Sequence, residues 1–489
     1  MRRRIVVVGA GATAASLLMQ LSGVPGIDSI DLIAPGTAGL GTAFGATDPS
    51  VLCNTSVDVT SLTAHGTSDL LRYLAARGHP VGRDDFVPRY LVGQYARERL
   101  TRALQQLRSR GVRTRHVRSR VTGVAPGNDG RSYDVSLAGG HVLNGTDIAL
   151  CLGADAPALP PALQPHTGSP QLLDSPYPTN RLTRLPDDAR VLVLGSKLSA
   201  IDAGLVLCRS PRRRVTLTSP SAVLPAVRTR LRRMPTMHIS SDDWRSLHPD
   251  DPEFDGKLAR RLVRAVRRAS PGGTVPRPRT AGTAEELLRR ETQQARTGAV
   301  AWQDVMAELI DALNAHTCDW TQRQRDAFFT RHRPLIARYI SAIPLPNAEL
   351  LLSAMERRQL TVAPAQPRSL TPGPQGQGWH AHWPDGRDEH FDHLVCATGY
   401  RAPRLAVADG TLLLDAPGGT PPAIGTDLRI RLRSDGHAER IWALGACAGS
   451  RYPIVNYLRA SAQHAENVAA QIRDTPQQLP LALDGRTSP

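Results

Sequence analysis

Apolar positions near the start of the chain follow the order strand, glycine turn, helix, strand. Residues 5–8 form a short β-branched run, residues 9–14 are rich in glycine and alanine, and residues 17–21 continue with helical spacing. Residues 30–33 then form a second strand pattern. This order predicts a β-turn-α-β unit, which opens a dinucleotide-binding domain.

The same order returns in the middle of the chain. Residues 191–194 form a strand pattern, residues 195–200 a turn, and residues 201–206 a helical pattern that leads to a strand at 215–217. Eight prolines lie between positions 157 and 186, which is typical of an irregular crossing between domains. The sequence therefore predicts a second nucleotide-binding unit.

The rest of the chain completes an α/β fold of two Rossmann-like domains with a helical insertion. Helical spacing is expected over residues 240–360, broken by a Pro/Gly loop at 270–278, and a last helix over 454–472 with a loose tail from Thr475. Strand patterns recur at 379–383 and 393–397. The predicted domains are 1–185 (first nucleotide-binding domain), 186–365 (second, with the insertion) and 366–489 (return to the first).

Composition narrows the class of partner. The 489 residues include 60 Lys and Arg against 44 Asp and Glu, a net charge of +16, and all of the basic residues except Lys197 and Lys257 are arginine. The arginines are spread along the chain without a basic tail or zinc-finger spacing, so a small anionic molecule is favoured over nucleic acid. The six cysteines form no C-x-x-C pair, which leaves a metal site or disulfide framework without a signal and predicts reduced, cytoplasmic thiols. No run of 18 apolar residues predicts a membrane span.

The turn after the first strand has the pattern G-x-G-x-x-A at Gly9, Gly11 and Ala14. Gly9 permits the tight turn, Gly11 lets the backbone approach a pyrophosphate, and Ala14 lets the helix pack on the strand. The free N–H groups at the helix start then face the anion. The alternative is a glycine-rich turn without a ligand. The second strand runs into Ala34, so the acidic residue that usually binds the ribose is missing.

The second turn departs further from the usual pattern. Gly195, Ser196 and Ala200 stand at expected positions, but Lys197 replaces the second glycine, and its ammonium could contact a phosphate. Arg228 and the neighbouring Arg230 follow the next strand and could pair with the 2′-phosphate of NADPH. Solvated arginines are an equally good interpretation of these two.

Two later strands end in glycine motifs. Residues 392–400 finish as A-T-G-Y, with Thr398 and Gly399, and residues 441–447 carry Gly445 directly after a strand. The order of all four motifs resembles that of the two-dinucleotide-binding flavin monooxygenases, close to their N-hydroxylating branch. In that family the A-T-G-Y strand marks the crossing between domains, and the glycine equivalent to Gly445 lies beside the ribityl and phosphate part of FAD.

Further blocks resemble a broader bacterial FAD/NAD(P)-binding family over nearly the whole chain. The matching blocks are residues 41–45, 48–49, 52–54 and 86–90, with Gly93, Tyr95 and the block 453–459. Within that family, residues 54–62 and 451–459 look most similar to L-aspartate N-monooxygenases, which form nitrosuccinate. The resemblance implies FAD on the first and last segments and NADPH on the middle one. It also implies that hydride reduces the flavin, that oxygen adds to give a C4a-hydroperoxide, and that a neutral amine attacks the distal oxygen.

The resemblance also suggests site residues. It places residues 54–61 near the flavin ring, with Asn54 as a catalytic candidate and Ser61 as a substrate contact. Arg89 and Val121 are expected to contact the cofactor. His65 could take the proton of the amine. Asn54 could instead cap a turn, Arg89 could form a structural salt bridge, and His65 could have no catalytic role.

A dicarboxylic substrate requires cations, and arginine offers a planar fork for a carboxylate. Arg451 is the first choice because it directly follows the Gly445 loop. Arg440 and Arg290 are weaker candidates, for which an exposed arginine without a ligand is the favoured interpretation. We therefore expect an FAD- and NADPH-dependent N-monooxygenase of a small amino acid, L-aspartate first, with O2 as co-substrate and a homo-oligomer left open. The alternatives are an ornithine or lysine N-hydroxylase, a Baeyer–Villiger-type monooxygenase, or a nucleotide-binding regulator without turnover.

Overall fold

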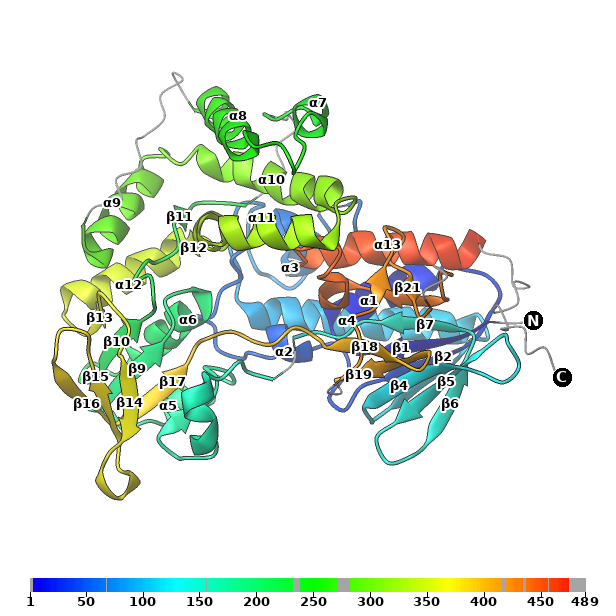
Figure 1. Ribbon diagram of the computed structural model, residues 1–489, viewed down its shortest axis with the longest axis horizontal. Helices are drawn as coiled ribbons and strands as arrows, with labels where there is room; N and C mark the ends of the chain where they lie inside the picture. Colours follow the sequence, from blue (N-terminus) through cyan, green and yellow to red (C-terminus); the bar gives the residue numbers. More distant parts are fainter. Residues whose placement is uncertain are drawn as a thin grey trace.

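Two parallel β-sheets lie side by side in the protein (Figure 1). The computed structural model describes residues 3–66, 68–154, 156–231, 238–270, 282–415, 418–433, 437–455 and 457–474. The tail from Thr475, most of the Pro/Gly stretch and Asn456 of the last family block lie outside these residues.

The first sheet has the strand order β22-β7-β1-β2-β3, and all its pairings are parallel. Its strands are β1 (Arg3–Val8), β2 (Ile27–Ile33), β3 (Arg113–Val117), β7 (Asp147–Leu150) and β22 (Ile441–Ala443). Three helices pack into one apolar core on one face: α1 (Ala12–Leu21), α4 (Arg89–Ser109) and α13 (Leu458–Asp474). The expected first strand, turn and helix are confirmed, and the last helix begins four residues later than expected.

An antiparallel sheet covers the other face of the first sheet. It has the order β18-β19-β4-β5-β6, with the strands β18 (Leu405–Ala408), β19 (Thr411–Leu414), β4 (Val121–Pro126), β5 (Tyr133–Leu137) and β6 (Val142–Gly145). Val6 and Val8 of β1 share a core with Val124 and Leu412 of this sheet. Since β1 alternates its side chains between two buried faces, it reads as a continuous apolar run in the sequence.

The second parallel sheet has the order β13-β10-β9-β17-β8. Its strands are β8 (Leu172–Leu173), β9 (Arg190–Leu194), β10 (Arg214–Thr218), β13 (Leu360–Val362) and β17 (His393–Cys396). Helices α6 (Leu198–Leu207) and α12 (Leu345–Glu356) cover one face. The small antiparallel sheet β14 (Ser369–Pro372), β15 (Trp379–His382) and β16 (Asp388–Phe391) covers the other face.

Sheet membership corrects the expected domain boundaries. Strands β8 and β17 lie outside the expected segment 186–365, yet both pair within the second sheet. The chain crosses between the sheets near Pro157 on the way out and near Tyr400 on the way back, and these two residues form an isolated bridge. The β14–β16 sheet belongs to the second domain, because its Trp379 and Phe391 complete the apolar core there.

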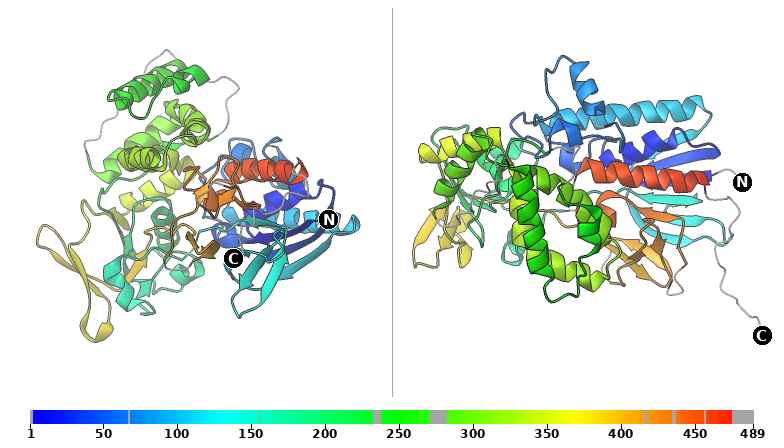
Figure 2. Two further views of the ribbon diagram at one scale, coloured as in Figure 1. Left: turned by 45° about the vertical axis from the view of Figure 1, so that its right-hand side comes forward. Right: turned by 90° about the horizontal axis from the view of Figure 1, so that it is seen from above.

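The helical insertion leaves the second domain through β11 (Val227–Arg228) and returns through β12 (Ile343–Pro344), which pair in parallel. It contains α7 (Ser241–Arg245), α8 (Phe254–Ala269), α9 (Ala284–Arg296), α10 (Trp302–Thr317) and α11 (Gln322–Leu335), followed by a π-helical turn, η4 (Ile336–Ile340). Capping boxes begin α9 at Thr283 and α11 at Thr321. Figure 2 shows α8, α10 and α11 gathered at one side of the molecule. Within the described residues, none of the helices is long and apolar enough to cross a membrane.

Candidate functional site

The glycine turns of the two parallel sheets have the same construction. Gly9 follows β1 with a φ of 102°, donates to the carbonyl of Ile33 at 2.8 Å, and leaves no space for a Cβ because the carbonyl of Cys151 lies there. Gly195 follows β9 with a φ of 147°, donates to the carbonyl of Thr218 at 2.7 Å, and faces the carbonyl of Ala397 in the same way. Each turn lies where the strand order of its sheet reverses. In open α/β sheets ligands bind at this point.

The first turn meets the end of the chain. Gly11 is the N-cap of α1, and a Cβ on it would have only the Cα of Gly41 nearby, at 3.7 Å. Gly445 has a φ of 57°, and a Cβ there would approach the Oγ1 of Thr13 to 2.8 Å. The structure thus brings together two motifs that lie more than 400 residues apart in the sequence. Ala14 is fully buried under this turn, as expected.

The Gly445 loop is held from the last helix. The backbone N–H of Gly445 donates to Nδ1 of His464 at 3.2 Å, and Ser461 shares a hydrogen bond with Thr13 at 3.0 Å. Burial lowers the pKa of His464 to about 4, so the imidazole is neutral and its Nδ1 is free to accept. The sequence reasoning missed His464, although its spacing from Gly445 on the last helix is the signal that could have found it.

Two side chains of the second turn bond to the loop that follows β10. The Lys197 ammonium donates to the carbonyl of Val223 at 2.8 Å, and burial and the nearby Arg338 lower its pKa. Ser196 shares a hydrogen bond with Ser219 at 2.7 Å and donates to the same carbonyl. Ala200 is fully buried in α6, as its place in the motif predicts.

The expected role of Arg228 is wrong in this structure. Its side chain is fully buried at the root of the helical insertion and donates to the carbonyls of Tyr339 and Ile340 at 2.7 and 2.6 Å. Burial lowers its pKa to about 9, and its Nε and Nη1 have no hydrogen-bond partner. A phosphate cannot reach it from solvent. Arg230 forms a bidentate pair with Asp304, at 3.0 and 2.7 Å.

Arg89 is a structural ion pair, as the alternative interpretation had it. It begins α4 and reaches Asp202 of α6 at 3.1 Å, while also donating to the Tyr177 hydroxyl at 3.1 Å and the Leu52 carbonyl at 3.2 Å. Burial raises the pKa of Asp202. Burial alone would lower the pKa of the Arg89 guanidinium, but Asp202, Tyr177 and Cys53 together outweigh it and raise that pKa. The pair therefore joins the two domains, and no described contact directs Arg89 toward the Gly9 turn.

Thr398 and Gly399 lie at the crossing between the sheets. The Thr398 hydroxyl donates to the carbonyl of Ala158 at 2.7 Å, and the carbonyl of Gly399 accepts from Ala158 at 3.0 Å. Val121 is the first residue of β4 and is buried in the core between the sheets. The A-T-G-Y motif thus marks a domain crossing, and its contact with a cofactor stays a prediction.

Hydrogen bonds of serine hydroxyls fix the segment that is expected to face the flavin. Ser61 is buried and shares a hydrogen bond with Thr63 at 3.0 Å. Ser56 donates to the carbonyl of Asp84 at 2.9 Å and accepts from the backbone of Leu231 at 2.8 Å. Asn54 lies half-buried at the start of this segment. The helical insertion therefore contacts the 54–61 segment directly, through Leu231.

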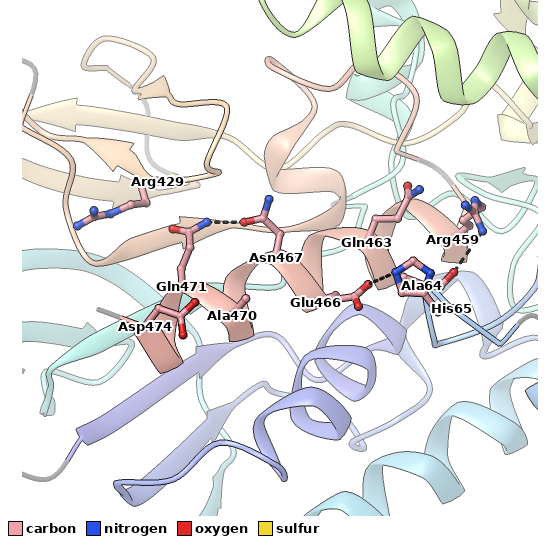
Figure 3. Close-up of a pocket in the computed structure, with 10 residues that line it drawn as sticks. All are labelled: Ala64, His65, Arg429, Arg459, Gln463, Glu466, Asn467, Ala470, Gln471 and Asp474. Carbon is pink, nitrogen blue, oxygen red and sulfur yellow. Dashed lines mark hydrogen bonds and ion pairs between the residues drawn. The ribbon is translucent and has the colours of Figure 1, made fainter. Parts of the chain in front are cut away.

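His65 does not lie in an enclosed site. Its side chain is 88% exposed and pairs with Glu466 at 3.3 Å. Figure 3 shows both in an open hollow of about 780 Å³ along the outer face of α13. An imidazole in contact with bulk water cannot hold a proton in a shielded reaction, so the expected catalytic role is corrected.

The three arginines chosen for the substrate lie apart. Arg440 is buried before β22, at the opposite end of that strand from Gly445, and donates to the carbonyl of Arg131. Arg290 lies on α9, at the far end of the molecule from α13 in Figure 1. Neither is near the Gly445 loop, because strand direction and the insertion separate them. Of the three, only Arg451 has its backbone at that loop, where its N–H donates to the carbonyl of Ala448 at 2.9 Å. Its buried Nε has no hydrogen-bond partner.

The segment that follows Arg451 lies along α10. Asn314 donates to the carbonyl of Ile454 and accepts from its N–H, at 2.7 and 3.0 Å. Farther along, Asp311 accepts from the hydroxyl of Tyr457 at 2.9 Å and lies 3.4 Å from Nε of Arg459. Sequence reasoning missed these partners because α10 lies more than 130 residues away in the chain.

Residues 6–155 match a protein-family model described as FAD-NAD(P)-binding.

Solved structures are similar to this protein over nearly the whole chain. An ornithine N-hydroxylase of Kutzneria sp. 744 has a TM-score of 0.61 at 16% identity, over 96% of this chain and 99% of that one. The FAD-bound cadaverine monooxygenase of Erwinia amylovora has 0.59 at 15%, over 100% and 99%. The fold is that of the N-hydroxylating flavin monooxygenases. An L-lysine 6-monooxygenase of Pseudomonas syringae shares the N-hydroxylase fold, with a TM-score of 0.56 at 16% identity over 96% and 99%. No curated protein matches at the level of sequence.

The residues at both glycine turns fit dinucleotides. At Gly9 and Gly195 the space of a side chain is taken by neighbouring backbone, while Gly11 faces outward with room above it. The N-terminus of α1 and that of α6 follow directly, and each supplies free N–H groups for a pyrophosphate. The described residues include no group of three His, Cys, Asp or Glu side chains placed to hold a metal.

Proposed function

We propose that the protein is an FAD- and NADPH-dependent N-monooxygenase that hydroxylates the amine of a small amino acid. The observation that carries this proposal is the pair of glycine turns at the reversal points of two parallel sheets. A protein that only binds a nucleotide needs one such turn, whereas hydride transfer between two nucleotides needs both. The similarity to ornithine, lysine and cadaverine hydroxylases supports the reaction class.

FAD would be held by the 9–14 turn, the start of α1 and the Gly445 loop, and NADPH by the 195–200 turn and the start of α6. When bound, these two cofactors supply the hydride and the activation of oxygen. The chain itself supplies orientation and exclusion of water. Our candidates for this task are residues 54–61, the α10 face with Asp311 and Asn314, and the 451–459 segment that contacts it.

We propose L-aspartate as the first substrate to test, followed by oxidation as far as nitrosuccinate. Support comes from the resemblance of residues 54–62 and 451–459 to aspartate N-monooxygenases and from Arg451. A guanidinium beside the Gly445 loop attracts a second carboxylate and repels the distal ammonium of ornithine or lysine. The competing proposals are ornithine or lysine N-hydroxylation and Baeyer–Villiger oxygen insertion.

The experiment measures two quantities with the purified, FAD-loaded protein. NADPH oxidation separates an enzyme from a non-catalytic binder, and detection of hydroxylamine or nitroso product over aspartate, ornithine, lysine and cadaverine separates the substrates. We expect product with aspartate alone. Turnover of ornithine with aspartate inert would remove the substrate claim and keep the reaction class.

The Arg451→Ala variant tests the proposed carboxylate contact. We expect the KM for aspartate to rise tenfold or more, since one charged hydrogen bond is worth about 1.5–3 kcal/mol, while flavin reduction by NADPH stays within twofold. Arg451→Lys should restore binding only in part, because a point charge lacks the fork geometry. An unchanged KM in Arg451→Ala would assign the substrate carboxylate to another residue.

A further inference from the structure

Helix α6 of the second domain is held by the first domain at its middle and just beyond its end. At the middle, Asp202 pairs with Arg89 of α4. Just beyond its end, Arg209 forms a bidentate pair with Asp48, one arm at 2.8 Å, and also bonds Ser50. We call these two ion pairs the clamp. Between them, Val51 is fully buried in the core of the second domain, although it belongs to a loop of the first.

The two ion pairs of the clamp have opposite polarity. The first domain contributes the cation at the middle of α6 and the anion just beyond its end. Sliding or turning α6 against the first domain would therefore bring like charges together or leave charges unpaired. The Arg89–Asp202 pair is largely shielded from water, with side-chain exposures of 18% and 4%. Separating these two charges by moving α6 would therefore cost far more free energy than separating a pair at the surface.

The clamp lies between the segment that we assign to the flavin and the turn that we assign to NADPH. Arg89 donates to the carbonyl of Leu52, two residues before Asn54 and the segment we assign to the flavin. Asp202 lies in the second turn of the helix whose N-cap is Lys197, within the turn we assign to NADPH. Tyr177, in the connector, accepts from Arg89 and donates to Asp202, so the crossing chain is fixed at the same point.

We propose that the clamp residues Arg89, Asp202, Asp48 and Arg209 are positioning residues that set the spacing between flavin and nicotinamide for hydride transfer. This proposal rests on the proposed function. Hydride transfer needs the reacting atoms within about 3–3.5 Å, and a displacement of 1 Å can cost about a hundredfold in rate. A buried ion pair is a poor source of net stability, but it discriminates strongly between arrangements.

The decisive variant replaces the buried end of the clamp with apolar groups of similar volume: Arg89→Met, Tyr177→Phe and Asp202→Leu together. A purely structural pair would show its loss in stability, whereas apolar replacement of a buried pair is often neutral. We expect the melting temperature and FAD content to stay near those of the wild type. We expect the rate of anaerobic flavin reduction at saturating NADPH to fall tenfold or more, with the NADPH Kd within threefold.

A second readout needs no turnover. Spin labels at Gln105→Cys on α4 and Leu350→Cys on α12, both exposed, report the distance between the domains. Five of the six native thiols are buried, and burial raises the pKa of the sixth, Cys208, to about 12, so they label slowly. We expect a broader or shifted distance distribution in the triple variant.

The matched control is Arg115→Gln, which removes an exposed bidentate pair with Asp31 inside the first domain. It should change neither readout. If the triple variant fails to fold, Asp48→Asn with Arg209→Gln tests the solvent-side end of the clamp with the same measurements.

The proposal is overturned by a folded variant whose distance distribution is unchanged and whose rate of flavin reduction stays within twofold of that of the wild type. If NADPH does not reduce the wild-type flavin, the proposed function fails, and the distance measurement still decides whether the clamp sets domain orientation.

Discussion

Gly9 and Gly11 differ in what surrounds them, in keeping with the different roles that the motif assigns to them. A side chain at Gly9 would overlap the carbonyl of Cys151 and would require a left-handed φ of 102°. A side chain at Gly11 would meet nothing closer than 3.7 Å. The first glycine is therefore required by the fold, and the second is available for a ligand.

This contrast predicts two different failures. Gly9→Ala should destabilise the protein by several kcal/mol or prevent folding, because backbone cannot move aside. Gly11→Asp should fold normally but lose FAD, since its carboxylate would face the pyrophosphate. The far-UV circular dichroism, melting temperature and flavin absorbance of each variant measure this. A yellow, fully loaded Gly11→Asp protein would show that FAD binds elsewhere.

His464 predicts how the Gly445 loop responds to acid. Its folded pKa of about 4 lies below the ordinary value of 6.5, so the unfolded chain binds a proton that the folded protein refuses. The stabilising contribution is present above pH 6.5 and is lost as the pH falls toward 4, by up to about 3 kcal/mol. Protonation at Nδ1 would also turn the acceptor of the Gly445 N–H into a donor.

The comparison of wild type with His464→Asn isolates this group from the many carboxylates. Asparagine keeps an acceptor but does not titrate. We expect the difference in unfolding free energy between the two proteins to shrink steadily from pH 7 to pH 4.5, measured by urea unfolding. A difference that is constant over this range would mean that His464 has the same pKa in the folded and the unfolded protein.

At the scale of elements, β11 and β12 form the root of the helical insertion, and Arg228 fastens it to the π-helical turn. The preference for NADPH, if present, must come from other groups. We expect Arg228→Met to leave the ratio of kcat/KM for NADPH and NADH within twofold, whatever it does to the melting temperature. A tenfold loss of preference would place the 2′-phosphate at Arg228 after all.

Sequence patterns predicted best those elements whose conformation is determined by residues close together in the sequence. The two glycine turns, their flanking strands and the helices of residues 240–360 follow from periodicity and from backbone conformation, which neighbours in sequence determine. The pairing of β19 with β4 escaped prediction because it joins residues almost 300 positions apart.

The candidate site residues also divide into those placed by a local motif and those whose surroundings depend on distant parts of the chain. Gly9, Gly11 and Gly445 were placed together correctly by motif order. Arg228 and Arg440 were misjudged because burial depends on which element packs above them, and arginine composition cannot report this. Arg89 was left open between cofactor and salt bridge. The salt bridge could not be predicted because Asp202 lies on another domain, and a cofactor contact of Arg89 stays a prediction.

At the scale of the whole molecule, the first domain is built from both ends of the chain. Strand β22 completes the first sheet beside β7, and α13 packs against α1. A protein ending at residue 436 should therefore expose β7 and one side of α1, and we expect it to be insoluble or to lack near-UV circular dichroism and bound flavin. Adding residues 437–489 as a separate chain tests whether the loss is one of packing alone, since the two pieces should then recover flavin absorbance.

The contact of Thr13, in the first turn of α1, with the Gly445 loop also sets an order of events during synthesis. At about 5–20 residues per second, roughly 20–90 s pass between translation of the first turn and translation of the loop that completes it. During that interval the apolar face of α1 has no α13 to cover it. In a cell, a chaperone that shields this helix on the ribosome, rather than the supply of FAD, should limit the yield of the holoprotein.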